Sequence, residues 1–481
     1  MGIAPSTKEL HVKNPRKHTL AVWEFTLACN LKCRHCGSSA GKKRKDELST
    51  NAALDVVRRL KDLGIKEVNL IGGEATLRPD WPVIGKAISD SGMALAFQTG
   101  GLHISPTILD QMVEIGTKGV GVSIDGVGDI HDNQRGVKGS YERALKTLDY
   151  LSDSKIPFLA CTTQLNRLSF TSLLELLDKV SQTRVKSWQI AQTLPMGIGT
   201  SATDLHFQPS DFLVIHELAA IFSVEAWKRG ILGIAANPLG YFGPYERLIR
   251  TGPHNINSFY QGCPAAKGVI GLEANGTIKG CPSLPTDPFS LGKSNESGFK
   301  KLETVFEISD SPYQNRINGF CADCPFSNVC WSGCGWSATT TMGQKGDNPY
   351  CMFRSIVNYG IAQYEQLEQQ SEGDLGPFEY GINKLNLYQG KNNKTIQMNQ
   401  IKIPEGMEET VQVFKEKRKN IVLSVQEIFN NFRKTNFSKD VNPLGMLKYM
   451  ELSCIPYEYL REIGALTETS VKSKNINEKP N

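Results

Sequence analysis

Three cysteines near the N-terminus are the first residues of this chain whose types and spacing could do chemistry. Cys29, Cys33 and Cys36 fall within the eight residues from 29 to 36. A structural zinc site needs four ligands, and a cubane iron-sulfur cluster held only by protein needs four cysteines, one for each iron. Three thiolates therefore fit a cubane with one open iron. The alternative is a zinc site that is completed by His35 or by a distant residue.

The sequence around this loop favours the cubane. An apolar, β-rich run from 20 to 26 precedes the cysteines, and a second apolar run ends in Gly72-Gly73-Glu74. Together they resemble the C-x3-C-x2-C signature and the layout of the radical S-adenosylmethionine (SAM) enzymes. The resemblance implies that the open iron binds the amino and carboxylate groups of SAM, and that the reduced cluster cleaves SAM to a 5′-deoxyadenosyl radical. The glycines would let backbone approach the ligand, and Glu74 would bind the SAM ammonium.

Seven further cysteines form a second group between residues 263 and 351. The segments Gly276-x4-Cys281 and Cys321-x2-Cys324-x5-Cys330-x3-Cys334, followed by Cys351, resemble the SPASM domain of radical SAM peptide maturases. This resemblance implies an outer cluster on Cys321, Cys324, Cys330 and Cys351 and an inner cluster on Cys263, Cys281 and Cys334. The sequence from 264 to 270 has no thiol or carboxylate, so the inner cluster is expected to keep an open iron unless a distant group caps it. The chain would then hold three 4Fe-4S clusters as well as SAM.

The elements that must position these residues follow an alternating pattern. Six β-rich runs at 19–26, 67–71, 94–98, 119–124, 157–162 and 187–192 alternate with helical patterns at 50–63, 80–89, 105–115, 140–151 and 169–180. Strands alternating with helices predict a parallel α/β sheet. Both the strand count and the resemblance favour a partial (β/α)6 TIM-like barrel.

Polar residues follow the predicted strands at the edge where parallel α/β folds bind ligands. Gln98 ends the third strand, Ser123 ends the fourth, and Gln164, Asn166, Gln189 and Gln192 lie on or after the last two. Ser123 to Gly136 resembles the S-x-D-G…H-D…R-G stretch of the peptide-modifying branch, which implies that Ser123 contacts the SAM ribose and Arg135 the SAM carboxylate; Asp125-Gly126 alone would also fit a plain turn. The cofactor-binding set implied by the resemblance is Gly72, Gly73, Glu74, Gln98, Ser123, Arg135 and His35.

Composition excludes several other classes of function. The chain has 481 residues, a net charge of +5 and 12 cysteines. No basic block alternates with aromatic residues, so nucleic-acid binding is not indicated, and no apolar run is long enough to span a membrane. Without a secretory signal, clustered cysteines indicate metal binding in a reducing compartment, here the cytoplasm. Cys161 and Cys454 lie outside the ligand groups, and Cys161 is expected to be an inert core thiol.

The predicted domains follow from these patterns. They are a radical SAM barrel at 15–200, a bridge at 201–262 with a helix at 209–229, a SPASM domain at 263–360, a helical C-terminal extension at 361–470 and a disordered tail at 471–481. The extension carries no ligand cluster, and the resemblance does not cover it.

The predicted function is therefore a radical SAM enzyme that abstracts hydrogen from a ribosomally made precursor peptide. Gly73 to Trp81 and the long extension incline the prediction toward tyramine-excising, splicease-type maturases. Thioether or carbon-carbon cross-linking and sulfatase-type side-chain oxidation remain alternatives, as does a non-enzymatic iron-sulfur or zinc scaffold. The expected partners are the precursor peptide, a leader-peptide-binding protein and an electron donor such as flavodoxin or ferredoxin.

Overall fold

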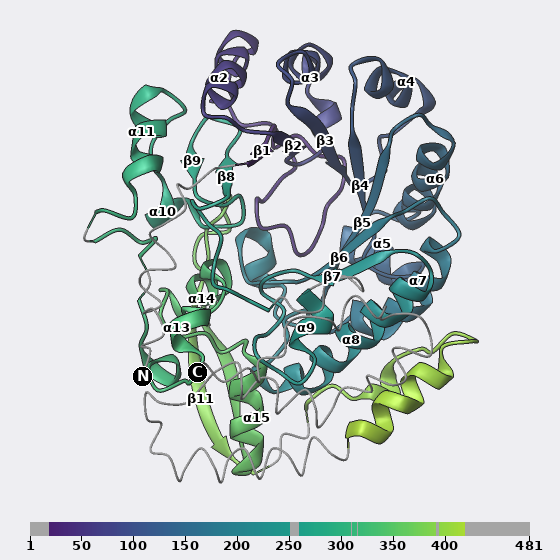
Figure 1. Ribbon diagram of the computed structural model, residues 1–481, viewed down its shortest axis with the longest axis vertical. Helices are drawn as coiled ribbons and strands as arrows, with labels where there is room; N and C mark the ends of the chain where they lie inside the picture. Colours follow the sequence, from purple (N-terminus) through teal and green to yellow (C-terminus); the bar gives the residue numbers. More distant parts are fainter. Residues whose placement is uncertain (1–18, 251–258, 309, 315, 391–393, 419–481) are drawn as a thin grey trace, which may run out of the picture.

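The computed structural model describes residues 19–250, 259–308, 310–314, 316–390 and 394–418. A curved sheet of nine strands dominates this part of the chain, in the order β7-β6-β5-β4-β3-β2-β1-β8-β9. Figure 1 shows helices on the outside of the curved sheet and the cysteine-rich region beyond its β8–β9 edge.

The first six strands and their helices form the predicted partial barrel. The strands are β1 (Leu20–Glu24), β2 (Glu67–Ile71), β3 (Ala94–Thr99), β4 (Gly119–Ser123), β5 (Phe158–Leu165) and β6 (Ser187–Gln192), and each pairs in parallel with the next. The helices are α2 (Thr50–Asp62), α3 (Trp81–Asp90), α4 (Pro106–Glu114), α5 (Asp129–Arg135), α6 (Ser140–Asp153) and α7 (Leu173–Val180). All six predicted strands and all five predicted helices are confirmed. The short helix α5 was not predicted.

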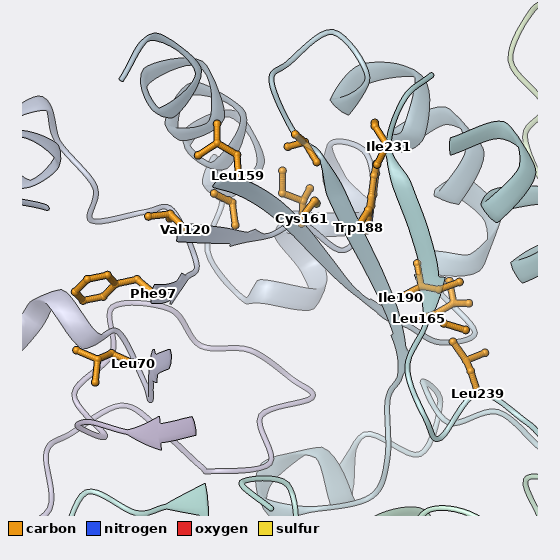
Figure 2. Close-up of a cluster of buried hydrophobic side chains, with 14 of the residues drawn as sticks. Leu70, Phe97, Val120, Leu159, Cys161, Leu165, Trp188, Ile190, Ile231 and Leu239 are labelled. Carbon is orange, nitrogen blue, oxygen red and sulfur yellow. The ribbon is translucent and has the colours of Figure 1, made fainter. Parts of the chain in front are cut away.

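Alternation along the strands separates the core from the inner face of the sheet. Phe97, Val120, Leu159 and Trp188 are buried on the side that packs against the helices, as Figure 2 shows for these residues and Cys161. Side chains between them along each strand point to the concave inner face. Helix starts are fixed locally, because the Ser49 and Ser105 side chains accept hydrogen bonds from the first turns of α2 and α4.

The sheet is longer than the six strands expected from the sequence. After α8 (Phe212–Lys228), the short strand β7 (Leu232–Ala235) pairs in parallel with β6. At the other edge, β8 (Val269–Leu272) pairs in parallel with β1 and antiparallel with β9 (Ile278–Lys279). The predicted bridge therefore contributes a strand to the sheet, and the predicted SPASM region is joined to the barrel by main-chain hydrogen bonds. Strands of two to four residues give too little alternation to be recognised in a sequence.

The cysteine-rich region is built mainly of short helices. It contains α10 (Thr286–Phe289), α11 (Glu296–Thr304), α12 (Gly319–Ala322), α13 (Ser327–Cys330), α14 (Gly335–Met342) and α15 (Met352–Gly360). A small hydrophobic cluster, separate from the main core, contains Cys330, Cys334 and Cys351 together with Tyr241, Phe242 and Phe326. Cysteines and aromatic side chains thus share one small core.

The predicted helical extension requires a correction. Strands β10 (Gln363–Ser371) and β11 (Ile382–Gln389) form an antiparallel hairpin instead. Its Gln- and Glu-rich sequence favours a helix locally, but Tyr364 stacks on Tyr388, and Glu365 forms a buried ion pair with Arg354. These contacts of the paired strands therefore outweigh the local helix propensity of the sequence.

Further along the extension, the predicted helix at 408–415 is confirmed within a helix over 408–418. The predicted helix at 424–432 and the tail 471–481 lie outside the described residues. No described helix is long and apolar enough to cross a membrane.

Candidate active site

The loop with Cys29, Cys33 and Cys36 lies at the carboxyl end of β1. The Leu31 N–H donates to the Cys29 Sγ at 3.4 Å, and the Ala40 N–H donates to the Cys36 Sγ at 3.3 Å. Burial, with a smaller contribution from the neighbouring thiols, raises the pKa of Cys29 to about 11 and that of Cys33 to about 12. The three side chains are thus close together, and Cys29 and Cys33 need a metal to become thiolates at neutral pH.

Gly72 and Gly73 pack against the chain that enters this loop. A Cβ on Gly72, whose φ is +143°, would lie 2.3 Å from the Thr26 carbonyl oxygen, and one on Gly73 would lie 2.3 Å from the Ala28 oxygen. The Gly73 and Glu74 N–H groups donate to these same two carbonyls at 2.7 and 2.8 Å. Because Gly72 and Gly73 have no side chains, the end of β2 can approach the cysteine loop. The sequence analysis did not predict this contact.

Glu74 is a buried carboxylate beside the cysteine loop. Its Oε1 accepts a hydrogen bond from the Thr76 hydroxyl at 2.9 Å. Its Oε2 accepts bonds from the Thr99 hydroxyl at 2.6 Å and the Gly100 N–H at 3.2 Å. Its charge contributes to the raised pKa of Cys29. The carboxylate is thus fixed at the strand ends where SAM is predicted to bind.

Gln98 and Ser123 meet on the inner face of the sheet. The Gln98 Nε2 donates to the Ser123 hydroxyl at 2.8 Å and to the Thr162 hydroxyl at 2.9 Å. A Cβ on Gly121 would lie 2.2 Å from the Gln98 Oε1, so this glycine makes room for the amide to cross β4. These neutral side chains make a polar inner wall together with the exposed Gln189, which pairs with Thr162 on the neighbouring strand β6.

Asp125 and Arg135 form a buried ion pair instead of a plain turn. The Arg135 Nε lies 2.6 Å from the Asp125 Oδ2, and the Gln164 N–H donates to the Asp125 Oδ1 at 2.8 Å. A second nitrogen of Arg135 donates to the Cys33 Sγ at 3.8 Å. Despite burial, the Arg135 charge holds the pKa of Asp125 below its usual value. Arg135 thus links the cysteine loop to the end of β4.

Two histidines lie beside this ion pair. The His35 Nε2 is 3.6 Å from the Asp125 Oδ2, and the His131 Nδ1 accepts a hydrogen bond from the Asp125 N–H. Burial lowers the pKa of both histidines to about 4. They are therefore neutral at pH 7, and His35 has Asp125 as a partner inside the chain.

The other predicted strand-end amides differ in their surroundings. Asn166 is buried, and its side chain bonds to Gln134, Thr193 and the Leu168 and Ser169 backbone, which indicates a structural role. Gln192 is fully buried, and both of its amide atoms lack a hydrogen-bond partner among the described residues.

The predicted outer cysteines are gathered around one cavity. Its lining includes Cys321, Cys324, Cys330 and Cys351 with the aromatic residues Tyr241, Phe242, Phe320, Phe326 and Phe353. Burial raises the pKa of Cys351 to about 11 and of Cys321 to about 12. The grouping agrees with the predicted outer set, and cluster binding there stays a prediction.

The predicted inner cysteines are also close together. The Cys334 thiol beside Cys263 lowers the pKa of Cys263, while the pKa of Cys334 is raised. The Cys263 charge raises the pKa of Cys281 beyond the effect of burial. Within the described ranges, no three His, Cys, Asp or Glu side chains converge on the position of a single metal ion.

The sequence analysis missed a buried charge network between the barrel and the cysteine-rich region. Glu24, at the end of β1, accepts a bond from the Ala274 N–H and lies 3.8 Å from Arg44. Arg44 and Lys279 pair with Glu273 at 3.0 and 3.1 Å. Burial raises the pKa of Glu24 to about 8, although Arg44 and Lys279 oppose the shift. In the sequence, the only indication of this network was the presence of charged residues on or just after neighbouring strands.

This raised pKa predicts a pH-dependent stability. Because folding raises the pKa of Glu24 from 4.5 to about 8, the unfolding free energy should fall as pH rises through this window, by at most about 1.4 kcal/mol per pH unit. Glu24→Gln mimics the protonated carboxyl and should flatten this slope. Thermal unfolding of both proteins at pH 6 and pH 8.5 measures the effect. Asp55→Asn, on the exposed face of α2, is the control, and equal slopes in wild type and Glu24→Gln would contradict the prediction.

The loop of the β10–β11 hairpin also reaches the cysteine loop. The Phe378 N–H donates to the Gly37 carbonyl at 2.9 Å, and the Ser39 hydroxyl donates to the Leu375 carbonyl at 2.6 Å. Ser39 also accepts a bond from the Ile198 N–H. The C-terminal hairpin therefore braces the predicted radical site.

Comparison with known proteins agrees with this geometry. Residues 23–180 match the family described as the Radical SAM superfamily. The chain is 30% identical over 368 residues to the Fe-coproporphyrin III synthase of Methanosarcina barkeri, covering 73% of this chain and 90% of that protein. It is 27% identical over 338 residues to the mycofactocin maturase MftC of Mycobacterium tuberculosis, covering 69% and 82%.

A solved structure shows the same fold. The crystal structure of Streptococcus suis SuiB bound to the precursor peptide SuiA matches with a TM-score of 0.55 and 17% identity, covering 70% of this chain and 75% of that one. The partial barrel is thus shared beyond recognisable sequence similarity. The extent of the match to the Methanosarcina synthase, together with the match of residues 23–180, establishes that the chain belongs to the radical SAM superfamily of enzymes.

Proposed function

We propose that this enzyme modifies a ribosomally made precursor peptide by radical SAM chemistry. The observation that carries the proposal is the placement of Cys29, Cys33 and Cys36 beside the buried carboxylate of Glu74, at the edge of a neutral, polar inner wall. A cluster and SAM bound there would supply a 5′-deoxyadenosyl radical that abstracts hydrogen from the substrate. The chain's own residues hold SAM, orient the peptide and exclude water.

The residues around the cysteine loop fit SAM. Glu74 supplies a fixed negative charge for the SAM ammonium. Ser123 and Gln98 offer hydroxyl and amide groups for the SAM ribose. Arg135 forms an ion pair with Asp125 and a hydrogen bond with Cys33. We therefore propose that it positions the cysteine loop and that its remaining N–H groups bind the SAM carboxylate.

Two auxiliary clusters complete the proposed cofactor set of three. Cys321, Cys324, Cys330 and Cys351 would hold the outer cluster in the aromatic-lined cavity. Cys263, Cys281 and Cys334 would hold the inner cluster, with an open iron on the side of the substrate. Such clusters supply electron-transfer capacity near the site.

A tetrapyrrole substrate is the second candidate, because one relative is named Fe-coproporphyrin III synthase. Coproporphyrin carries propionate carboxylates, which proteins bind with arginine and lysine. Here the inner wall offers Gln98, Ser123 and Thr162. The cations of Arg135, Arg44 and Lys279 each have a carboxylate partner. A neutral wall with amide and hydroxyl groups supports a peptide in preference to a polyanion.

Within peptide chemistry, we propose splicease-type tyramine excision as the reaction to test first. Cross-linking and side-chain oxidation are the alternatives. The reaction would take place in the cytoplasm, with a leader-peptide-binding protein and a flavodoxin or ferredoxin as partners.

Anaerobic incubation distinguishes the two substrate classes. The reconstituted enzyme is mixed with SAM, a reductant and either the precursor peptides encoded beside its gene or iron coproporphyrin. A mass change in a peptide, together with stoichiometric 5′-deoxyadenosine, is the expected result. A mass change in the porphyrin alone would overturn the peptide assignment.

A further inference from the structure

The two sets of auxiliary cysteines have very different surroundings. Aromatic rings enclose the outer set, and Phe242 stacks on Phe326 with ring centroids 4.2 Å apart. Beside the inner set lie a phenol, Tyr260, and an ammonium group, Lys345. This contrast has electrostatic consequences for any redox centre that the cysteines hold.

Tyr260 has a buried hydroxyl with no hydrogen-bond partner among the described residues. The residue is 4% exposed and packs in the small core that contains Cys334 of the inner set together with Cys330 and Cys351 of the outer set. A phenol is a protonated donor at neutral pH, and Tyr260 lies within electrostatic range of the Cys263, Cys334 and Cys330 sulfur atoms. A buried donor without an acceptor is costly, so its position calls for a partner at the inner set.

The Tyr260 ring is held firmly in this position. Its centroid is 4.7 Å from that of Tyr241, whose hydroxyl accepts a bond from the Cys334 N–H at 2.8 Å. The Arg250 guanidinium lies over both rings, and the Tyr260 N–H donates to Glu246 at 3.0 Å. Rotation of the ring away from the cysteines would break these contacts.

Lys345 adds a positive charge on the same set. Its stem packs on Gly335, which follows Cys334. Its Nζ donates to the Tyr313 and Gln314 carbonyls, both at 3.3 Å. The Lys345 charge acts on both Cys263 and Cys334. The ammonium group is thus fixed within electrostatic range of two cysteines of the inner set.

We propose that Tyr260 donates a hydrogen bond to a sulfur of the inner auxiliary cluster and, with Lys345, sets the reduction potential of that cluster above that of the outer one. Reduction adds negative charge to a cluster, and this charge is stabilised by hydrogen bonds to sulfur and by nearby cations. Near the outer set lies the Arg354 guanidinium, but its charge is already paired with the carboxylates of Asp347 and Glu365. The inference rests on the three-cluster assignment of the proposed function.

Potentiometric titration followed by electron paramagnetic resonance tests the proposal. In a Cys29→Ala/Cys33→Ala/Cys36→Ala background, only the two auxiliary clusters contribute signals. Tyr260→Phe and Lys345→Met should each lower the midpoint of the higher-potential signal. The expected change is about tenfold in the ratio of reduced to oxidised cluster at fixed potential, or about 59 mV for one electron.

Tyr313→Phe is the matched control. The Tyr313 hydroxyl also lies near Cys281 and Cys263, but it is already used, since it donates to the Phe289 carbonyl at 2.6 Å and accepts from the Gly280 N–H at 2.7 Å. Its removal should reduce stability and leave the midpoint in place. An unchanged midpoint in both Tyr260→Phe and Lys345→Met, or the same shift in Tyr313→Phe, would overturn the proposal.

A second readout detects the hydrogen-bond donor directly. Electron-nuclear double resonance of the reduced protein in D2O should detect an exchangeable deuteron coupled to the higher-potential cluster, and Tyr260→Phe should remove one such coupling. Absence of a phenolic deuteron would overturn the Tyr260 assignment. Iron analysis separates this failure from a failure of the proposed function: the background variant should contain about eight irons, and about four would show that one auxiliary cluster does not exist.

Discussion

Replacing Cys29, Cys33 and Cys36 together with alanine should abolish 5′-deoxyadenosine formation. These thiols are held beside Glu74 at the carboxyl end of β1, and no other described cysteines lie at that edge of the barrel. Loss of the ligands removes the site at which SAM would be reduced. The iron content should fall from about twelve to about eight per chain, because a cubane holds four irons. Reductive SAM cleavage and iron content are measured on the same anaerobic sample.

Cys161→Ala is the matched control in the same domain. Cys161 is fully buried on the core side of β5, packed among Leu159 and Trp188 (Figure 2). Its removal should cost some stability without loss of iron or SAM cleavage. Reductive cleavage that persists in the triple variant, or iron that stays at about twelve, would contradict the assignment of the three cysteines.

The sequence predicted those features that depend on local pattern. Six strands could be located because apolar residues either follow one another or alternate with polar ones along each of them, and the helices between them carry apolar stripes and serine caps. The ten cysteines could be grouped because their spacing is itself the signal. Strands as short as β7 and β9, with four and two residues, carry no comparable pattern. The hairpin was missed because Gln and Glu favour helices until a partner strand is present.

The contacts between segments that are far apart in the chain could not be predicted from the sequence. The Glu24–Ala274 bond spans 250 positions, and the Ser39–Leu375 bond spans 336. From the sequence, Asp125 could be part of the S-x-D-G stretch or of a plain turn, and only the structure shows that Arg135 lies against it. Tyr260 belongs to no sequence motif, and its buried hydroxyl, which has no hydrogen-bond partner in the part of the chain that the structure describes, is visible only in the structure. Such features arise from packing of the whole chain, and one sequence does not encode them in a local pattern.

Glu74→Gln should weaken SAM binding without unfolding the protein. The Glu74 Oε2 accepts bonds from the Thr99 hydroxyl and the Gly100 N–H, and the Oε1 accepts one from the Thr76 hydroxyl. In the variant the amide oxygen can keep the first two bonds, and the amide nitrogen can donate to Thr76, because a hydroxyl also accepts. The fold should therefore persist. What is lost is the negative charge opposite the SAM ammonium.

A charge-assisted hydrogen bond of this kind contributes about 1.5–3 kcal/mol, so the Kd for SAM should rise about 10- to 150-fold. Calorimetry on the reconstituted protein measures it. Glu47→Gln is the matched control, since Glu47 accepts bonds from Thr26, the Leu27 N–H and the Arg44 N–H close to the same loop. Glu47→Gln should lower the stability of the protein and leave the Kd for SAM unchanged. An unchanged Kd in Glu74→Gln, or an equal rise in Glu47→Gln, would mean that Glu74 supports the loop and does not bind SAM.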